Sequence, residues 1–154
     1  MYQKEKTAAF SGHRSEKLPK EPGLIRSLKT SAYIETHQAV QRGYDTFIIG
    51  VRDGFDFMVA EQLLLIKETA EHLGFWKVRL VAALPENEQS AEEWAGILEK
   101  CDEVVTGDYR WMIDQSSLLI CFYNHSSGET GDTVAYAYQK EMDVINIHDY
   151  DQKE

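Results

Sequence analysis

Six short runs rich in apolar residues alternate with helical patterns along this chain, and that alternation constrains the fold more than any other feature. The runs occupy residues 7–10, 46–49, 78–84, 103–106, 117–123 and 144–147. Apolar runs bounded by turn residues are typical of strands that are buried on both faces. Because strands that alternate with helices form parallel sheets, we predict an α/β fold. We expect a three-layer, Rossmann-like, doubly wound architecture. Its sheet is expected to be mainly parallel, with about six strands and with helices on both faces.

The segments between the runs carry helical signals. We expect helices at residues 24–42, 91–100, 110–116 and 134–141, and one more that ends at Gly74. The apolar positions of that helix recur at 4-3-4-3 spacing, at Val59, Leu63, Ile66, Ala70 and Leu73. Gly43 and Gly74 are typical helix stops. Residues 15–23, which hold two of the three prolines, and residues 86–89 are predicted as loops.

Composition limits the class of protein. A length of 154 residues is most simply one domain over 1–154, with frayed tails at 1–6 and 148–154. The net charge of −10 disfavours a broad surface for nucleic acid. No apolar run approaches the roughly 20 residues of a membrane span, and the polar start is unlike a signal peptide. Cys101 and Cys121 lack metal or redox spacing, which suggests buried thiols in a reducing cytoplasm.

The turns after the predicted strands differ from the turns after the helices. Glycine-containing or polar turns follow strands, at residues 11–14, 50–56, 85–89, 107–110 and 124–133, whereas the turns at 43–45 and 74–76 are brief. Ligands of parallel α/β sheets bind outside the carboxyl ends of the strands. Residues 124–133 also lead into a helix, whose free N–H groups attract anions. We therefore predict a small-molecule cleft at this edge.

Five short motifs stand in order along the chain. They are Phe10-Ser11-Gly12-His13-Arg14, Gly50-x-x-x-Gly54-x-Asp56, Ala83-Leu84-Pro85, Trp111-Met112-x-Asp114-x-Ser116-x-Leu118-Leu119-Ile120 and Gly128-x-Thr130-x-x-Thr133. In this order they resemble the YpsA-like branch of the SLOG superfamily. These are Rossmann-type domains related to the DNA-processing protein DprA and to the "lonely guy" phosphoribohydrolases. The resemblance covers roughly residues 7–147 and implies a nucleotide or nucleotide-derived ligand.

The resemblance and the turns together select the candidate ligand-binding residues. They are Gly12, His13, Arg14, Gly50, Arg52, Gly54, Asp56, Arg110, Gly128, Glu129, Thr130 and Thr133. Donors at 128–133 and the cations Arg14 or Arg52 would hold an anionic group. Structural alternatives remain open at this point. His13 and Arg14 would start a solvated loop, Asp56 and Thr130 would cap helices, and Arg110 would pair with Asp114 on the surface.

Two departures from the family pattern concern charged residues. Val51, Arg52 and Asp53 stand between the glycines of the second motif, where family members usually carry small residues. Glu129 stands where the last motif usually has a second glycine. A carboxylate beside an anion site is repulsive unless it meets a cation or a ribose hydroxyl.

Three functions follow as hypotheses. The first is a cytoplasmic binding or sensor domain for a nucleotide-like ligand. The second is an enzyme that hydrolyses a nucleotide N-glycosidic bond. The catalytic glutamate of the phosphoribohydrolases would fall near Ala135 and is missing, which leaves Glu129 or Asp56 as substitutes. The third is a module that binds single-stranded DNA, against which the net charge counts.

We expect no required cofactor and no metal site. The five histidines, at 13, 37, 72, 125 and 148, include no pair at metal-ligand spacing. The acidic residues at 86, 88, 92 and 93 are interpreted as a solvated face. Aromatic residues enriched on the helices make a homodimer plausible, namely Tyr33, Trp94, Trp111, Tyr136 and Tyr138.

Overall fold

The computed structural model describes residues 2–74, 76–86 and 92–152, in which six parallel strands form one sheet. The strands are β1 (Thr7–Gly12), β2 (Thr46–Gly50), β3 (Arg79–Leu84), β4 (Glu103–Thr106), β5 (Leu118–Phe122) and β6 (Asp143–Asn146). Their order is β4-β3-β2-β1-β5-β6, and every neighbouring pair is parallel. The predicted α/β, doubly wound architecture is confirmed.

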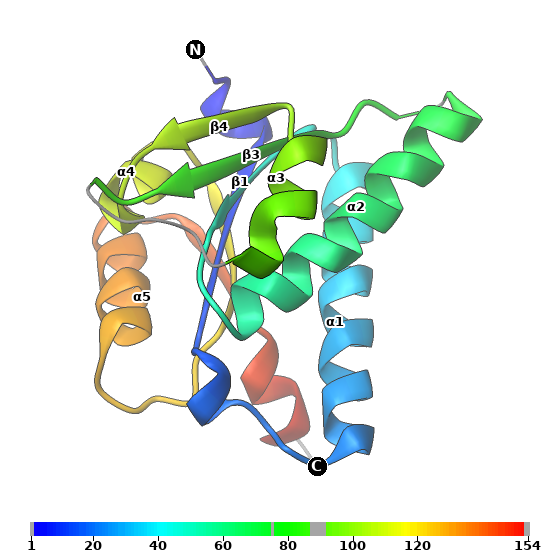
Figure 1. Cartoon of the computed structure of the whole chain (residues 1–154). Helices are drawn as coiled ribbons and strands as arrows, with labels where there is room; N and C mark the ends of the chain where they lie inside the picture. Colours follow the sequence, from blue (N-terminus) through cyan, green and yellow to red (C-terminus); the bar gives the residue numbers. More distant parts are fainter. Residues whose placement is uncertain (1, 75, 87–91, 153–154) are drawn as a thin grey trace.

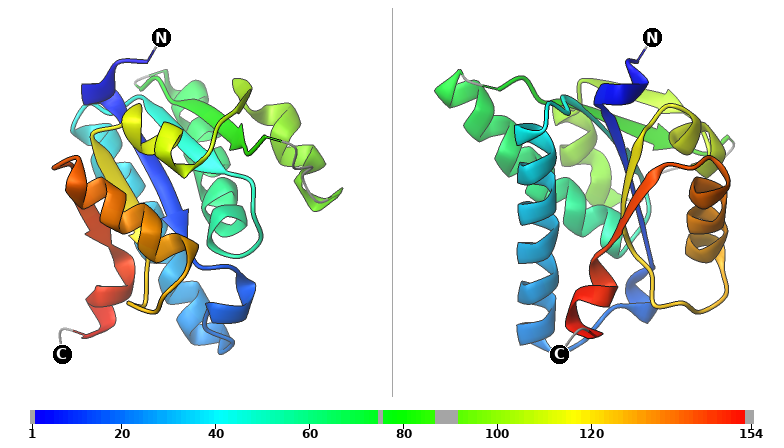
Figure 2. Two further views of the ribbon diagram at one scale, coloured as in Figure 1. Left: turned by 90° about the vertical axis from the view of Figure 1, so that its left-hand side faces the viewer. Right: turned by 180° about the vertical axis from the view of Figure 1, so that it is seen from behind.

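Helices cover both faces of the sheet (Figure 1). The helices are α1 (Pro22–Gln41), α2 (Phe55–Leu73), α3 (Ala95–Lys100), α4 (Tyr109–Asp114) and α5 (Glu129–Gln139). α1, α2 and α3 lie on one face, and α4 and α5 lie on the other, which the left view of Figure 2 shows from the front. Short 3₁₀ helices are η1 (Lys4–Lys6), η2 (Ser15–Lys17), η3 (Glu92–Trp94) and η4 (Ile147–Gln152).

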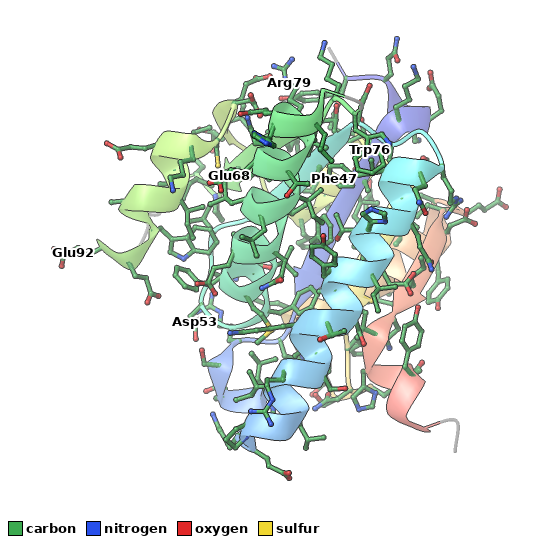
Figure 3. All side chains as sticks on the ribbon, turned by 90° about the vertical axis from the view of Figure 1, so that its right-hand side faces the viewer. Phe47, Asp53, Glu68, Trp76, Arg79 and Glu92 are labelled. Atoms are coloured by element: carbon green, nitrogen blue, oxygen red, sulfur yellow. The ribbon has the colours of Figure 1, made fainter. Side chains whose placement is uncertain are left out.

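Side chains of each central strand alternate between two apolar cores. Phe10 and Phe47 belong to the core under α1 and α2, the face that Figure 3 shows with Phe47 labelled. Ala9 and Ile48 belong to the core under α4 and α5. Because both faces of the sheet are covered, the strands read as continuous apolar runs rather than as alternating ones. Trp94, a candidate interface residue, is only 1% exposed and belongs to the first core.

Several element boundaries differ from the prediction. β1 continues through Gly12 rather than ending at residue 10, and α2 begins at Phe55. The largest difference is at α5, which begins at Glu129 and not at residue 134. Glycine and threonine have low helix propensity, so residues 130–133 read as a loop. Burial of Thr130 and Thr133 overrides that propensity.

The chain end from residue 148, predicted as a frayed polar tail, is placed as part of η4 through Gln152. Ile147 is 4% exposed, and η4 packs against β5 and α1. Residues 4–6 of the predicted N-terminal tail form η1. The predicted loop at 86–89 and the predicted helix start at 91 fall mostly outside the described residues. Among the helices that the structure describes, none combines the length and apolar composition needed to cross a membrane.

The strand order reverses between β1 and β5, and this reversal opens a crevice at the carboxyl ends of the two strands. From β1 the chain passes through α1 to β2 on one side, whereas β5 lies on the other side of β1. The helices that follow these two strands, α1 and α5, lie on opposite faces of the sheet (Figure 1). Their connections therefore diverge at the carboxyl ends of β1 and β5, which is where ligands of open α/β sheets bind.

Candidate functional site

A cavity of about 540 Å³ lies at this carboxyl edge of the sheet. Its size is typical of small-molecule sites. Its walls come from the ends of β1, β2 and β3, the turns that follow β1 to β4, and the first turns of α2, α4 and α5. The lining residues are Phe10, Ser11, Gly12, His13, Arg14, Glu16, Lys17, Gly50, Arg52, Asp56, Ala83, Pro85, Gly107, Asp108, Tyr109, Met112, Gly128, Glu129, Thr130 and Thr133.

Most of the residues selected from the sequence line this cavity, and two do not. Gly54 and Arg110 are outside the lining. Arg110 instead donates from Nε to the hydroxyl of Tyr109 and lies over the ring of Tyr136. Asp114, its proposed surface partner, accepts a hydrogen bond from Tyr136 and lies 3.8 Å from Lys140.

Gly54 has a structural role at the start of α2. Its φ of +84° is unfavourable for other residues, and a Cβ there would lie 2.6 Å from the backbone nitrogen of Ser15. The next residue, Phe55, donates its N–H to the carbonyl of His13 at 3.1 Å. A Cβ on Gly12 would in turn lie 2.3 Å from the Phe55 ring. These two glycines therefore let the start of α2 pack directly on the end of β1.

Asp56 is a buried carboxyl group that faces the cavity. It is not the cap of α2, because Gly54 is the N-cap and no side-chain cap bond is made. Within the described part of the chain, its Oδ1 atom has no hydrogen-bond partner. Burial raises the pKa of Asp56 to about 7, although Arg52 and Arg14 oppose that shift. The raised pKa allows the group to carry a proton near neutral pH, and in that form it can donate a hydrogen bond.

Gly50 leaves room for this carboxyl. A Cβ at residue 50 would lie 2.7 Å from Oδ2 of Asp56. The glycine at the end of β2 thus allows the first turn of α2 to place a carboxyl behind the strand end. Both residues belong to the second motif selected from the sequence, and the structure shows that a side chain at residue 50 would meet the Asp56 carboxyl.

Glu129 meets two cations at the mouth of the cavity. Arg52 donates to Oε2 of Glu129, and the guanidinium of Arg14 lies 3.8 Å from the same oxygen. Glu129 stays 68% exposed at its side chain. Two of the charged departures from the family pattern, Arg52 and Glu129, are therefore partners of each other. Glu129 also lies in the first turn of α5, where a negative charge is favourable.

Lys17 is a site residue that the sequence analysis missed. Its Nζ donates to Oγ of Ser126 and to the carbonyl of Ser127, both at 2.9 Å. It thereby connects the turn after β1 with the loop before α5. The only available signal was the basic character of residues 14–20, which does not specify a partner. Asp108 was missed as well, and it caps α4 by accepting from the N–H of Trp111.

His13 is a buried positioning residue and not the start of a solvated loop. It is 3% exposed, and its Nε2 accepts a hydrogen bond from the N–H of Asn124 at 3.0 Å. Burial lowers the pKa of His13. The ring is therefore neutral at pH 7, with its proton on Nδ1, and does not supply a cation to the cavity. Arg14, the next residue, is exposed and supplies one.

The start of α5 presents backbone donors at this edge. Gly128 is the N-cap, with φ of 137° and no side-chain cap bond. The first N–H groups of a helix have no acceptor within it. Thr133 donates its hydroxyl to the carbonyl of Glu129, so that hydroxyl already has an acceptor. The donors available at this helix start are therefore mainly the backbone N–H groups of its first turn.

Neither a protein-family model nor a curated protein sequence matches this chain. The resemblance to the SLOG superfamily therefore stays a prediction from the motifs.

Proposed function

We propose that this chain is a cytoplasmic binding or sensor domain, of the SLOG type, for a nucleotide or nucleotide-derived ligand. One observation carries the proposal. The start of α5 and the guanidinium groups of Arg14 and Arg52 line one cavity where the strand order reverses. Backbone N–H groups at a helix start and arginine forks are the two most common protein partners of phosphate.

The rest of the cavity suits the uncharged part of such a ligand. Tyr109 and Met112 line the wall that follows β4 and offer an aromatic and an apolar surface to a base. Asp56, whose Oδ1 has no hydrogen-bond partner among residues 2–74, 76–86 and 92–152, offers a hydrogen bond to a ribose hydroxyl or a base edge. In this arrangement the phosphate lies at α5 and the base lies toward α4.

Glu129 competes with the ligand in this proposal. Its carboxylate occupies Arg52, so an anionic ligand has to displace it. Removing the negative charge should therefore strengthen binding. We expect Glu129→Gln to lower the dissociation constant for an anionic ligand several-fold, and we expect Arg52→Ala or Arg14→Ala to raise it about tenfold or more.

The test is thermal melting of the purified protein against nucleoside monophosphates, dinucleotides, nucleotide sugars and ADP-ribose. A ligand that binds only the folded state raises the melting temperature in a concentration-dependent way. Calorimetric titration of the active compound then compares the Arg14→Ala and Arg52→Ala variants with Arg26→Ala, an exposed arginine on α1 outside the cavity. No shift from any compound, or equal losses in all three variants, would refute the proposal.

A second candidate function is favoured by Asp56 alone. Hydrolysis of an N-glycosidic bond breaks the C–N bond, adds the hydroxyl of water to C1′ and gives a proton to the leaving base. A general acid for that proton works best with a pKa near the working pH. The pKa of Asp56, about 7, meets this condition. Release of free base from a nucleoside monophosphate, lost in Asp56→Asn, would establish this activity, and the absence of release from every bound nucleotide would exclude it.

A further inference from the structure

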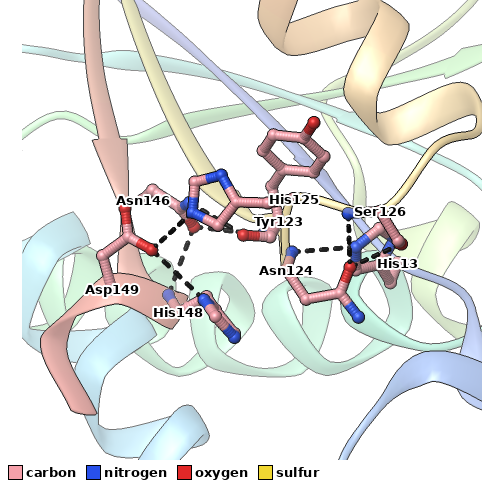
Figure 4. A network of polar contacts seen from close by, with 8 residues as sticks. All are labelled: His13, Tyr123, Asn124, His125, Ser126, Asn146, His148 and Asp149. Atoms are coloured by element: carbon pink, nitrogen blue, oxygen red, sulfur yellow. Dashed lines mark hydrogen bonds and ion pairs between the residues drawn. The ribbon is translucent and has the colours of Figure 1, made fainter. Parts of the chain in front are cut away.

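We propose that His125, His148 and Asp149 form a binding site for a divalent transition-metal ion of the zinc type, separate from the cavity. One ligand atom from each residue lies within 4.8 Å of the other two. Nε2 of His125 is 2.8 Å from Oδ1 of Asp149, and Nδ1 of His148 is 3.2 Å from the same oxygen (Figure 4). None of the three lines the cavity.

The three residues meet because β5 and β6 are neighbours. His125 lies in the loop after β5, and His148 and Asp149 lie in η4 after β6. Parallel pairing brings both strand ends to the same edge of the sheet. Spacing along the sequence could not show this, because 23 residues separate the two histidines.

The donor set identifies the class of metal. Two imidazoles with one carboxylate are ligands that zinc and other late first-row ions prefer, whereas Mg²⁺ and Ca²⁺ prefer oxygen ligands alone. Bonds of about 2.0–2.2 Å in a tetrahedral site place the donor atoms roughly 3.3–3.6 Å apart. The two nitrogen-to-oxygen separations, 2.8 and 3.2 Å, would have to widen by less than about 1 Å, and all three donor atoms already lie within 4.8 Å of one another. An ion between the rings and the carboxylate would replace their hydrogen bonds.

The side chain of Asn146 supports both sides of the cluster. Asn146 accepts at Oδ1 from the N–H groups of Tyr123 and His148, and its Nδ2 donates to the carbonyl of Tyr123. One side chain therefore fixes the backbone two residues before His125 and that of His148 (Figure 4). Asn124 is held by His13 and accepts at Oδ1 from Ser126. Support of this kind orients metal ligands and strengthens binding.

The site is open to solvent on one side. The side chains of His125, Asp149 and His148 are 59%, 40% and 24% exposed. Three protein ligands with an accessible face leave a coordination position for water or another ligand, unlike the four-ligand sites that only stabilise a fold. The competing explanation is that Asp149 simply ties η4 to the loop through its hydrogen bond with His125, and bonds its neighbour His148 within η4. That explanation requires no affinity for metal.

The test titrates Zn²⁺ into the untagged, chelator-treated full chain by calorimetry and by competition with a chromogenic chelator. We expect one equivalent to bind with a dissociation constant in the micromolar range or below, and we expect no heat from Mg²⁺. His125→Asn and Asp149→Asn should each weaken binding at least tenfold. Asparagine tolerates the left-handed backbone of His125, whose φ is 69°, so the first variant keeps the loop conformation.

His72→Asn is the matched control, because His72 is an exposed histidine near the end of α2. It should bind Zn²⁺ like the parent chain. The visible absorption of Co²⁺ adds a readout of coordination, since four-coordinate Co²⁺ in a protein site absorbs more strongly than six-coordinate, hydrated Co²⁺. Circular dichroism checks that each variant is folded. The absence of one-to-one binding, or binding that His125→Asn and Asp149→Asn leave unchanged, would overturn the proposal in favour of the hydrogen-bonded tie.

Discussion

Replacing Asp56 with asparagine should stabilise the protein at alkaline pH and do so much less at acidic pH. The carboxyl is buried, and its Oδ1 has no partner within the described residues. Burial raises its pKa from 3.8 to about 7, against the opposing effects of Arg52 and Arg14. Asparagine has nearly the shape of the neutral carboxyl and cannot ionise. The variant therefore removes the cost of a buried charge and keeps the packing.

The magnitude follows from the pKa shift. A carboxyl with a raised pKa in the folded chain binds its proton more tightly there, so its contribution to stability is full below pH 3.8 and is lost as the pH rises through 7. Each pH unit in that window is worth about 1.4 kcal/mol, which gives on the order of 4 kcal/mol over the roughly three units. Between about pH 5 and pH 8 the expected change is roughly 2–3 kcal/mol.

Urea unfolding followed by tryptophan fluorescence measures this difference at both pH values. Asp53→Asn is the control with the opposite sign. Although burial acts to raise the pKa of Asp53, hydrogen bonds from Ser15 outweigh it and lower that pKa. Its carboxylate therefore stabilises the fold equally at pH 5 and pH 8, so Asp53→Asn should destabilise the protein to the same extent at both, and the effect is lost only as the pH falls below about 3.8. If Asp56→Asn increases the free energy of unfolding equally at pH 5 and pH 8, Asp56 is not a buried carboxyl with a raised pKa.

Three further outcomes can be checked on single variants. Gly54→Ala should cost more than about 3 kcal/mol in urea unfolding, because backbone strain adds to a contact with Ser15, whereas Gly74→Ala, with nothing within 4 Å of the added Cβ, should cost about 1 kcal/mol. A colorimetric thiol reagent at about pH 8 should react with the buried Cys121 only after urea is added, and only slowly with Cys101, which is partly exposed and not buried as the sequence suggested, since burial raises the pKa of Cys101 to about 11 and that of Cys121 to about 12. A double-mutant cycle between Arg52 and Glu129 should give a coupling below about 1 kcal/mol that disappears in about 1 M salt, because the pair is exposed. A stronger or salt-independent coupling would contradict that view of the pair.

The sheet could be predicted because burial on both faces leaves a strong sequence signal. The run at 117–123 is apolar at nearly every position, and β5 is fully buried over Leu118–Phe122. The edge that carries the cavity could also be predicted, since parallel strands place all of their following turns together. The start of α5 could not be. Gly131 and two threonines lower helix propensity there, and only the buried positions of Thr130 and Thr133 explain the helix.

The chemistry of the site was less accessible because it depends on contacts between distant residues. Arg52 and Glu129 are 77 positions apart, so their pairing follows from the placement of α2 and α5 and from no local pattern. His13 looks like a ligand-binding residue in the sequence, yet its burial and its bond to Asn124 make it a neutral support for the loop after β5. Asp56 looks like a helix cap, yet the glycine two residues earlier takes that position. The sequence indicated which positions belong to the site. It did not indicate their partners or their protonation states.

One short loop connects the two sites proposed for this protein. Residues 123–128 begin at Tyr123, which Asn146 fixes, and end at Gly128, the N-cap of α5. His125 lies in the middle, and Lys17 holds Ser126 and Ser127 next to the cavity. A metal ion bound between His125 and Asp149 would act on the same backbone that positions the start of α5. If binding at one site changes the affinity of the other, thermodynamics requires each ligand to affect the other by the same factor.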